Sequence, residues 1–119
     1  MEFKFDNSLI ILAKQVYYSY VMTFADLMKS EQPVLIDFYA DWCAPCRAMK
    51  PVLEDVKARL GENVNIYKID VDKNQALAAR FNVRSIPTLM IFSKGNAVWR
   101  KSGMASSAEL VTAVNAAQN

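Results

Sequence analysis

The chain has 119 residues, of which 53% are hydrophobic and 22% are charged, and this length and composition suit one compact domain with its own core. Lys and Arg number 14 against 12 Asp and Glu, so the net charge is only +2 and nucleic-acid binding through a basic surface is not expected. The sequence contains no histidine, which excludes Ser-His-Asp and Cys-His catalysis and zinc sites that use histidine.

Residues 1–21 form an N-terminal segment without a clear helical face, upstream of a single domain at residues 22–119. Two interpretations stay open: an edge strand at Lys14 to Val21, or a flexible extension. No stretch approaches the roughly 20 apolar residues that cross a bilayer, and the start does not resemble a secretory signal. We therefore expect no membrane partner and a cytoplasmic location, where cysteines stay reduced.

The next segments predict a short helix and a buried strand. Thr23 stands three residues before Asp26, a weak capping pattern for a helix that ends before Pro33. The run Val34 to Ala40 is continuously apolar apart from Asp37, which is typical of a central strand buried on both faces.

A longer helix follows directly, because apolar residues recur at helical spacing at Met49, Val52, Leu53, Val56 and Leu60. Gly61 is expected to end it, and Asp55 with Arg59 supports it as an i,i+4 pair. Val64 to Val71 alternates between apolar and polar residues, which predicts a second strand.

The second half of the chain predicts a short helix, a hairpin and a last helix. An Ala-rich stretch at 74–81 forms the short helix, and strands at 88–92 and 97–102 flank a turn at 93–96. Ser106 with Glu109 forms a capping box for the last helix. The predicted order is therefore strand, helix, strand, short helix, hairpin, helix.

The two cysteines form the motif Cys43-Ala44-Pro45-Cys46 at the start of the long helix. Sulfurs at i and i+3 in a first helical turn lie close enough to form a disulfide. So short a loop stabilises the fold weakly, by roughly 2 kcal/mol, and redox exchange is the better explanation for it. The helix N-terminus lowers the pKa of Cys43, which is the expected nucleophile, while Cys46 resolves the mixed disulfide. Trp42 is expected to shield the sulfur.

Other interpretations of the cysteines are two buried free thiols, or half of a metal site completed by another chain. Two cysteines without histidine cannot form a complete zinc site, so we expect no bound metal.

Two residues outside the cysteine motif, Asp37 and Lys68, also point to proton chemistry. Asp37, buried in the apolar strand, would have a raised pKa and accept the proton of Cys46, although a carboxylate at a strand end that reaches solvent remains an alternative. Lys68 would balance that charge if the two strands are neighbours, or else it is a solvated strand lysine. Pro87 opens an apolar strand, and both a cis and a trans Ile86–Pro87 bond remain open on the residues alone.

Several motifs together resemble the thioredoxin family over about residues 22 to 119. They are Asp37-Phe38-Tyr39-Ala40-Asp41-Trp42-Cys43-Ala44-Pro45-Cys46, Pro51, Lys68-Ile69-Asp70-Val71-Asp72, Ile86-Pro87-Thr88, Gly95 and Gly103. The resemblance implies an α/β thioredoxin fold with a central mixed β-sheet flanked by helices. It implies a dithiol site at Cys43 and Cys46, a buried acid at Asp37 beside Lys68, and a cis peptide at Pro87. It also implies a substrate groove lined by Trp42, Ala44, Pro45, Ile86, Pro87, Gly103 and Met104.

As a member of this family, the chain would be a monomeric protein-disulfide reductase that binds no cofactor, reduces disulfides in target proteins and maintains redox homeostasis. Its electrons would come from NADPH through a separate thioredoxin reductase. An oxidase or isomerase of related fold usually has histidine before the second cysteine, where this chain has Pro45. A binding module without redox turnover is the alternative from another class. Ala44, where the family usually has glycine, and the N-terminal segment depart from the family pattern.

Overall fold

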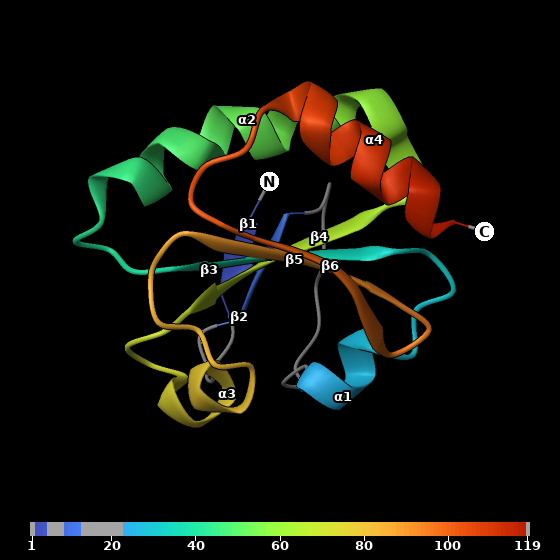
Figure 1. The fold of residues 1–119 in the computed structure, drawn as a ribbon. Helices are drawn as coiled ribbons and strands as arrows, with labels where there is room; N and C mark the ends of the chain where they lie inside the picture. Colours follow the sequence, from blue (N-terminus) through green and yellow to red (C-terminus); the bar gives the residue numbers. More distant parts are fainter. Residues whose placement is uncertain (1, 5–8, 13–22, 119) are drawn as a thin grey trace.

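The computed structural model describes residues 2–4, 9–12 and 23–118, which form a mixed sheet with helices on both faces (Figure 1). In chain order the elements are β1 (Glu2–Lys4), β2 (Leu9–Leu12), α1 (Phe24–Leu27), β3 (Val34–Tyr39), α2 (Ala44–Leu60), a 3₁₀ turn (Gly61–Asn63), β4 (Asn65–Asp70), α3 (Gln75–Arg80), β5 (Thr88–Ser93), β6 (Asn96–Ser102) and α4 (Ser107–Ala117). The predicted order of elements from the first helix onward is confirmed.

The described strands form one sheet in the order β1-β2-β4-β3-β5-β6. The inner strand β3 pairs in parallel with β4 and antiparallel with β5, and β6 completes the predicted hairpin with β5. On the other side, β2 pairs antiparallel with β4. The edge strand expected at 14–21 lies outside the described residues, and the strands that the structure describes upstream are β1 and β2.

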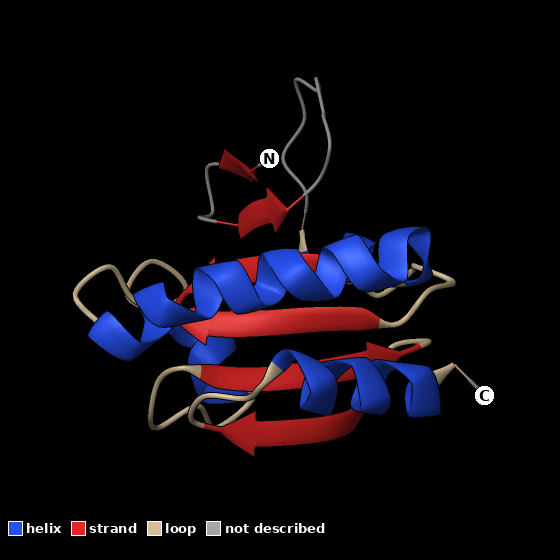
Figure 2. Ribbon diagram, turned by 90° about the horizontal axis from the view of Figure 1, so that it is seen from above, coloured by secondary structure: helices blue, strands red, loops and turns tan. Residues whose placement is uncertain are grey.

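Helices α2 and α4 lie together on one face of the sheet, and α1 and α3 lie on the other (Figures 1 and 2). Successive side chains of β3 alternate between these faces. Leu35 packs in the core under α2 and α4, whereas Ile36 and Phe38 pack in the core on the opposite face. Asp37, at the next position after Ile36, therefore points toward the face that α2 covers.

The strand predicted at 64–71 is β4, which is buried from Ile66 to Asp70. Lys68 is therefore not the solvated strand lysine that the sequence left open. The polar positions Lys68 and Asp70 are thus covered as well, because β4 lies inside the sheet between β2 and β3. A sequence pattern reports only polarity, and the position of a strand in the sheet decides how much of it is covered.

Of the two predicted capping boxes, the one at α1 is complete and the one at α4 is only half formed. Thr23 and Asp26 form a complete capping box at α1. At α4 the Ser106 hydroxyl accepts the Glu109 N–H at 3.1 Å, but both carboxylate oxygens of Glu109 accept from Lys101 Nζ. The reciprocal half of the predicted box is therefore replaced by an ion pair with β6, which a local pattern does not reveal.

Candidate active site

The two cysteines meet where β3 passes into α2. The chain turns after Tyr39, with the Cys43 N–H donating to the Ala40 carbonyl at 3.2 Å. Cys43 is the extended N-cap residue of α2, and its sulfur accepts the N–H of Cys46 at 3.2 Å. The two sulfurs form a disulfide across a Cα–Cα distance of 5.2 Å. The first cysteine thus caps its own helix, because unpaired N–H groups at a helix N-terminus favour an electron-rich partner.

Both cysteines are buried, with exposed fractions of 4% for Cys43 and 1% for Cys46. Cys46 is the less exposed of the two, as expected, but the helix N-terminus does not leave Cys43 open to solvent. Tyr39 and Ile86 pack against the pair, and the Ile86 carbonyl oxygen is 3.8 Å from Cys43 Sγ. Cys43 therefore presents only a small exposed surface between α2 and the segment before β5.

Trp42, which the sequence predicts to lie beside the sulfur, is 70% exposed. Its indole N–H donates to Asp72 Oδ2 at 2.8 Å. Asp72 is itself placed by the β4–α3 turn, in which Asp70 Oδ1 accepts the N–H groups of Asp72 and Lys73. Trp42 is thus oriented by a neighbouring segment and presents its ring to solvent.

Asp70 and Asp72 belong to a motif of the family resemblance, but the sequence analysis gave them no place in the site, although a signal was available. Strands β3 and β4 are parallel, so their carboxyl ends meet at the same edge of the sheet. Acidic residues that directly follow one such strand come to lie beside the residues that follow the other. The sequence Asp70-Val71-Asp72 at the end of β4 was therefore a candidate neighbour of the cysteine motif.

Asp37 is fully buried and lies opposite Lys68 in the register of β3 and β4. Among the described residues, neither carboxyl oxygen of Asp37 has a hydrogen-bond partner. Burial raises the pKa of Asp37 to about 7, and the charge of Lys68 opposes that rise. The Lys68 ammonium lies 4.5 Å from the centre of the Tyr39 ring. The predicted neighbourhood of Asp37 and Lys68 is confirmed, and it holds a carboxyl group that changes protonation near neutral pH.

The segment before β5 forms the opposite wall of the site. The Ile86–Pro87 peptide bond is cis, as the resemblance implied, and Pro87 is buried. The Gly103 N–H donates to the Pro87 carbonyl at 2.7 Å, and Gly103 has a φ of 101°, a conformation that favours glycine. This bond brings the loop after β6 beside the cis peptide, with Met104 exposed.

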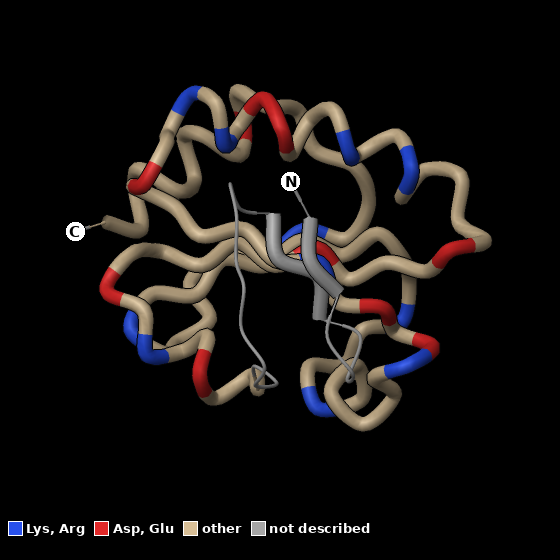
Figure 3. The backbone as a smooth tube through the Cα atoms, turned by 180° about the vertical axis from the view of Figure 1, so that it is seen from behind, with Lys and Arg blue, Asp and Glu red and all other residues tan. Residues whose placement is uncertain are grey.

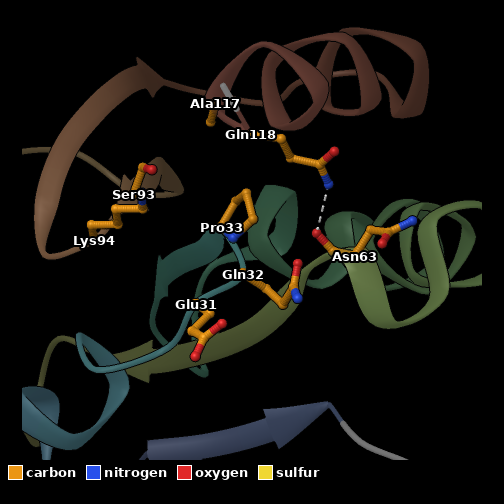
Figure 4. A pocket seen from close by; sticks show the side chains of 8 residues that line it. All are labelled: Glu31, Gln32, Pro33, Asn63, Ser93, Lys94, Ala117 and Gln118. Carbon is orange, nitrogen blue, oxygen red and sulfur yellow. Dashed lines mark hydrogen bonds between the residues drawn. The ribbon is translucent and has the colours of Figure 1, made fainter.

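A separate polar cavity of about 200 Å³ lies at the other end of the sheet (Figure 4). It is lined by Glu31, Gln32, Pro33, Asn63, Ser93, Lys94, Ala117 and Gln118. These residues lie before β3 and β4, at the end of β5 and at the end of α4, whereas the disulfide follows β3. The cavity is therefore not part of the disulfide site.

The described residues contain no group of three or more His, Cys, Asp or Glu side chains that could hold a metal ion. The two cysteine sulfurs are bonded to each other. Among the residues that the structure describes, no helix is both long and apolar enough to cross a membrane.

A disulfide that closes on the first turn of a helix and packs against the segment with the cis proline, together with a buried acid in the preceding strand, defines a thiol–disulfide oxidoreductase. Comparison with known proteins agrees, since the family model described as Thioredoxin matches residues 15–116. This chain belongs to the thioredoxin family, and its activity is thiol–disulfide reduction.

Individual relatives support the same assignment. A thioredoxin-like protein of Synechocystis is 43% identical over 74% of this chain and 85% of its own length. A bifunctional thioredoxin reductase/thioredoxin of Mycobacterium leprae is 42% identical over 74% of this chain and 19% of its own length. The structure of a mutant thioredoxin from Halobacterium salinarum superposes with a TM-score of 0.71 at 37% identity, covering 79% of this chain and 81% of that one.

Proposed function

We propose that this chain reduces disulfides in target proteins, with Cys43 as the nucleophile and Cys46 as the resolving thiol. The position of Cys43 as the N-cap of α2 carries this assignment. Its sulfur accepts the Cys46 N–H, so the helix N-terminus favours a thiolate at Cys43 once the disulfide is reduced. Cys46, which is less exposed, is less accessible to a target disulfide.

In the first step, the Cys43 thiolate attacks one sulfur of the target disulfide. A bond forms between Cys43 Sγ and that sulfur, the target S–S bond breaks, and the other target sulfur leaves as a thiolate that takes a proton from solvent. The product is a mixed disulfide between this chain and its target.

In the second step, Cys46 loses its proton and attacks Cys43 Sγ. The Cys43–Cys46 disulfide forms, the mixed disulfide breaks, and the target leaves with both of its sulfurs reduced. We propose Asp37 as the acceptor of the Cys46 proton, because it points toward the face covered by α2 and its pKa of about 7 lets it bind and release protons near neutral pH. Lys68 is its charge partner.

The target would lie in a groove around the disulfide. We propose that an extended target segment contacts the exposed side chains of Trp42 and Met104 on either side of the cis peptide. The proposed groove residues are Trp42, Ala44, Pro45, Ile86, Pro87, Gly103 and Met104.

The proposed electron source is NADPH, through a separate thioredoxin reductase that returns the Cys43–Cys46 disulfide to the dithiol. The bifunctional relative of Mycobacterium leprae, whose name joins a thioredoxin reductase to a thioredoxin, supports such a partner. We further propose that residues 22–119 form the functional domain, that residues 1–21 are an N-terminal segment added to it, and that the protein acts as a monomer in the cytoplasm.

Selective alkylation tests the assignment of the two thiols. At pH 7 the reduced protein is expected to react with iodoacetamide at Cys43 first, because only a thiolate reacts and the helix N-terminus favours a thiolate there. Peptide mapping by mass spectrometry locates the label, and denatured protein serves as the control in which both thiols react alike. Labelling of Cys46 first would reverse the two roles.

Replacement of Asp37 with asparagine tests the proton acceptor. The variant is expected to form the mixed disulfide at the normal rate but to resolve it roughly 100-fold more slowly, the lower end of what a positioned general base contributes. Quenched single-turnover reactions from pH 6 to 8 separate the two rates. Asp55→Asn removes a carboxylate at a surface ion pair of α2 and is the matched control. A resolution rate that Asp37→Asn leaves unchanged across this pH range would exclude the role.

A further inference from the structure

Exposed cationic side chains stand next to the residues that touch the disulfide. Arg47 directly follows Cys46 in α2. On the opposite wall, Arg84 stands two residues before Ile86, whose carbonyl oxygen is 3.8 Å from Cys43 Sγ. Both arginines are exposed. Adjacency in the chain therefore places one cationic residue next to Cys46 and another next to the segment that packs against the disulfide.

A third segment adds another cation, and α2 adds a fourth. Lys73 follows Asp72, whose carboxylate is hydrogen-bonded to the Trp42 indole. Lys50 lies one turn along α2 from Arg47, and both lysines are exposed. Basic segments accordingly lie along α2 and around α3, on the two layers that flank the sheet (Figure 3). We call Arg47, Lys50, Lys73 and Arg84 the basic collar.

The charges of the collar are not neutralised by ion pairs among the described residues, where the ion pairs join Lys29 to Asp26, Arg59 to Asp55 and Lys101 to Glu109. The two collar arginines bond to neutral acceptors instead. Arg47 donates to the Asp41 carbonyl, and Arg84 Nε donates to Asn82 Oδ1.

Acidic side chains near the disulfide are fewer than the cations. The exposed carboxylates that flank it are Asp72 and Asp41, and Asp72 already accepts the Trp42 indole N–H. The Asp70 carboxylate is buried and accepts the backbone N–H groups of Asp72 and Lys73. Four exposed cations thus accompany two exposed carboxylates near a site whose exposed large side chains, Trp42 and Met104, are apolar. The apolar side chains of Trp42 and Met104 can contact target segments of many sequences. The positive charges around them favour the segments that carry negative charge.

We propose that the basic collar selects target disulfides that are flanked by Asp or Glu residues. This inference rests on the proposed attack of Cys43 on a target disulfide, and it names the class of segment that reaches Cys43 fastest. Charges at the rim of an interface act mainly on the association rate, and salt screens them. The selection should therefore appear in kcat/KM at low salt and fade at high salt.

Two disulfide-looped peptides of identical length test the collar, one with two Glu residues and one with two Lys residues beside its cysteines. An exposed ion pair changes an equilibrium by about 1.4-fold to fivefold, so several together predict a preference of about tenfold for the acidic peptide in 20 mM NaCl. At 0.5 M NaCl the preference should fall to within about twofold, because the screening length is then well below 10 Å. The quantity measured is the second-order rate constant for oxidation of the reduced protein by each peptide.

Charge reversal identifies the residues responsible. Lys73→Glu with Arg84→Glu is expected to remove or invert the preference. Lys29→Glu with Lys94→Glu makes the same change of net charge before β3 and after β5, at the end of the sheet away from the disulfide, and should keep it. Arg84→Gln alone should reduce the preference without reversing it, and provides a milder variant. If Lys73→Glu with Arg84→Glu lowered the rate equally for the acidic and the basic peptide, the proposed selection by the basic collar would be wrong.

A neutral substrate separates this inference from the proposed function. Wild-type protein is also tested with bis(2-hydroxyethyl) disulfide, which carries no charge. Failure to reduce it would contradict the proposed reductase itself. Reduction of it, together with equal rates for the acidic and basic peptides at low salt, would leave the reductase standing and overturn the selection of acidic segments.

Discussion

Replacing Cys43 with serine is expected to abolish the reduction of insulin disulfides. The hydroxyl of serine cannot form a mixed disulfide, so the first step is lost. Cys46→Ser is expected to behave differently, because Cys43 can still attack a target while the second step has no thiol. This variant should accumulate a stable covalent adduct with the target.

Non-reducing gels and intact-mass measurement distinguish the two variants, since only Cys46→Ser should carry a trapped target. Turbidity from precipitating insulin chains reports the activity, and wild-type protein with dithiothreitol is the reference. A trapped adduct on Cys43→Ser would reverse the assignment. If a double serine variant kept full biological function, a binding module without redox turnover would be the better description.

Replacing Asp37 with asparagine is expected to raise the free energy of unfolding, and this gain should appear only above about pH 4. Burial raises the pKa of Asp37 from 3.8 to about 7, so the folded state holds this proton more tightly than the unfolded state does. Below about pH 4 the group is protonated in both states and costs nothing. The cost grows as the pH rises toward 7 and then stays constant, at up to about 4 kcal/mol.

Urea denaturation of oxidised protein at pH 4, 6 and 8 measures this effect as the difference in unfolding free energy between variant and wild type. The difference should be near zero at pH 4 and largest at pH 8. Asp55→Asn, at an exposed ion pair, should change stability by less than about 1 kcal/mol at every pH. A gain that does not depend on pH would show that ionisation of Asp37 is not its cause.

Several features of the candidate site are local, and the sequence was sufficient to predict them. Cys43 and Cys46 lie three residues apart at a helix start, so one helical turn determines that their sulfurs meet. The expected burial of Asp37 followed from the apolar run that contains it. The capping box at Thr23 likewise depends on four consecutive residues.

Other features depend on segments that are distant in the chain. The hydrogen bond from Trp42 to Asp72 exists because two parallel strands end at the same edge of the sheet. The Ile86–Pro87 cis bond could not be derived from the residues themselves and came only from the family resemblance. The low exposure of Cys43 results from packing against Ile86, which is 43 positions further along the chain.

The sequence by itself thus determined the redox pair, the buried acid and the order of elements from residue 23 onward, because each rests on short-range periodicity or on residue type. Only the tertiary structure decided the pairing of β2 with β4, the burial of β4 on both faces and the placement of charges around the disulfide. Strand order and contact between distant segments depend on how whole faces pack against each other. No local pattern carries that information.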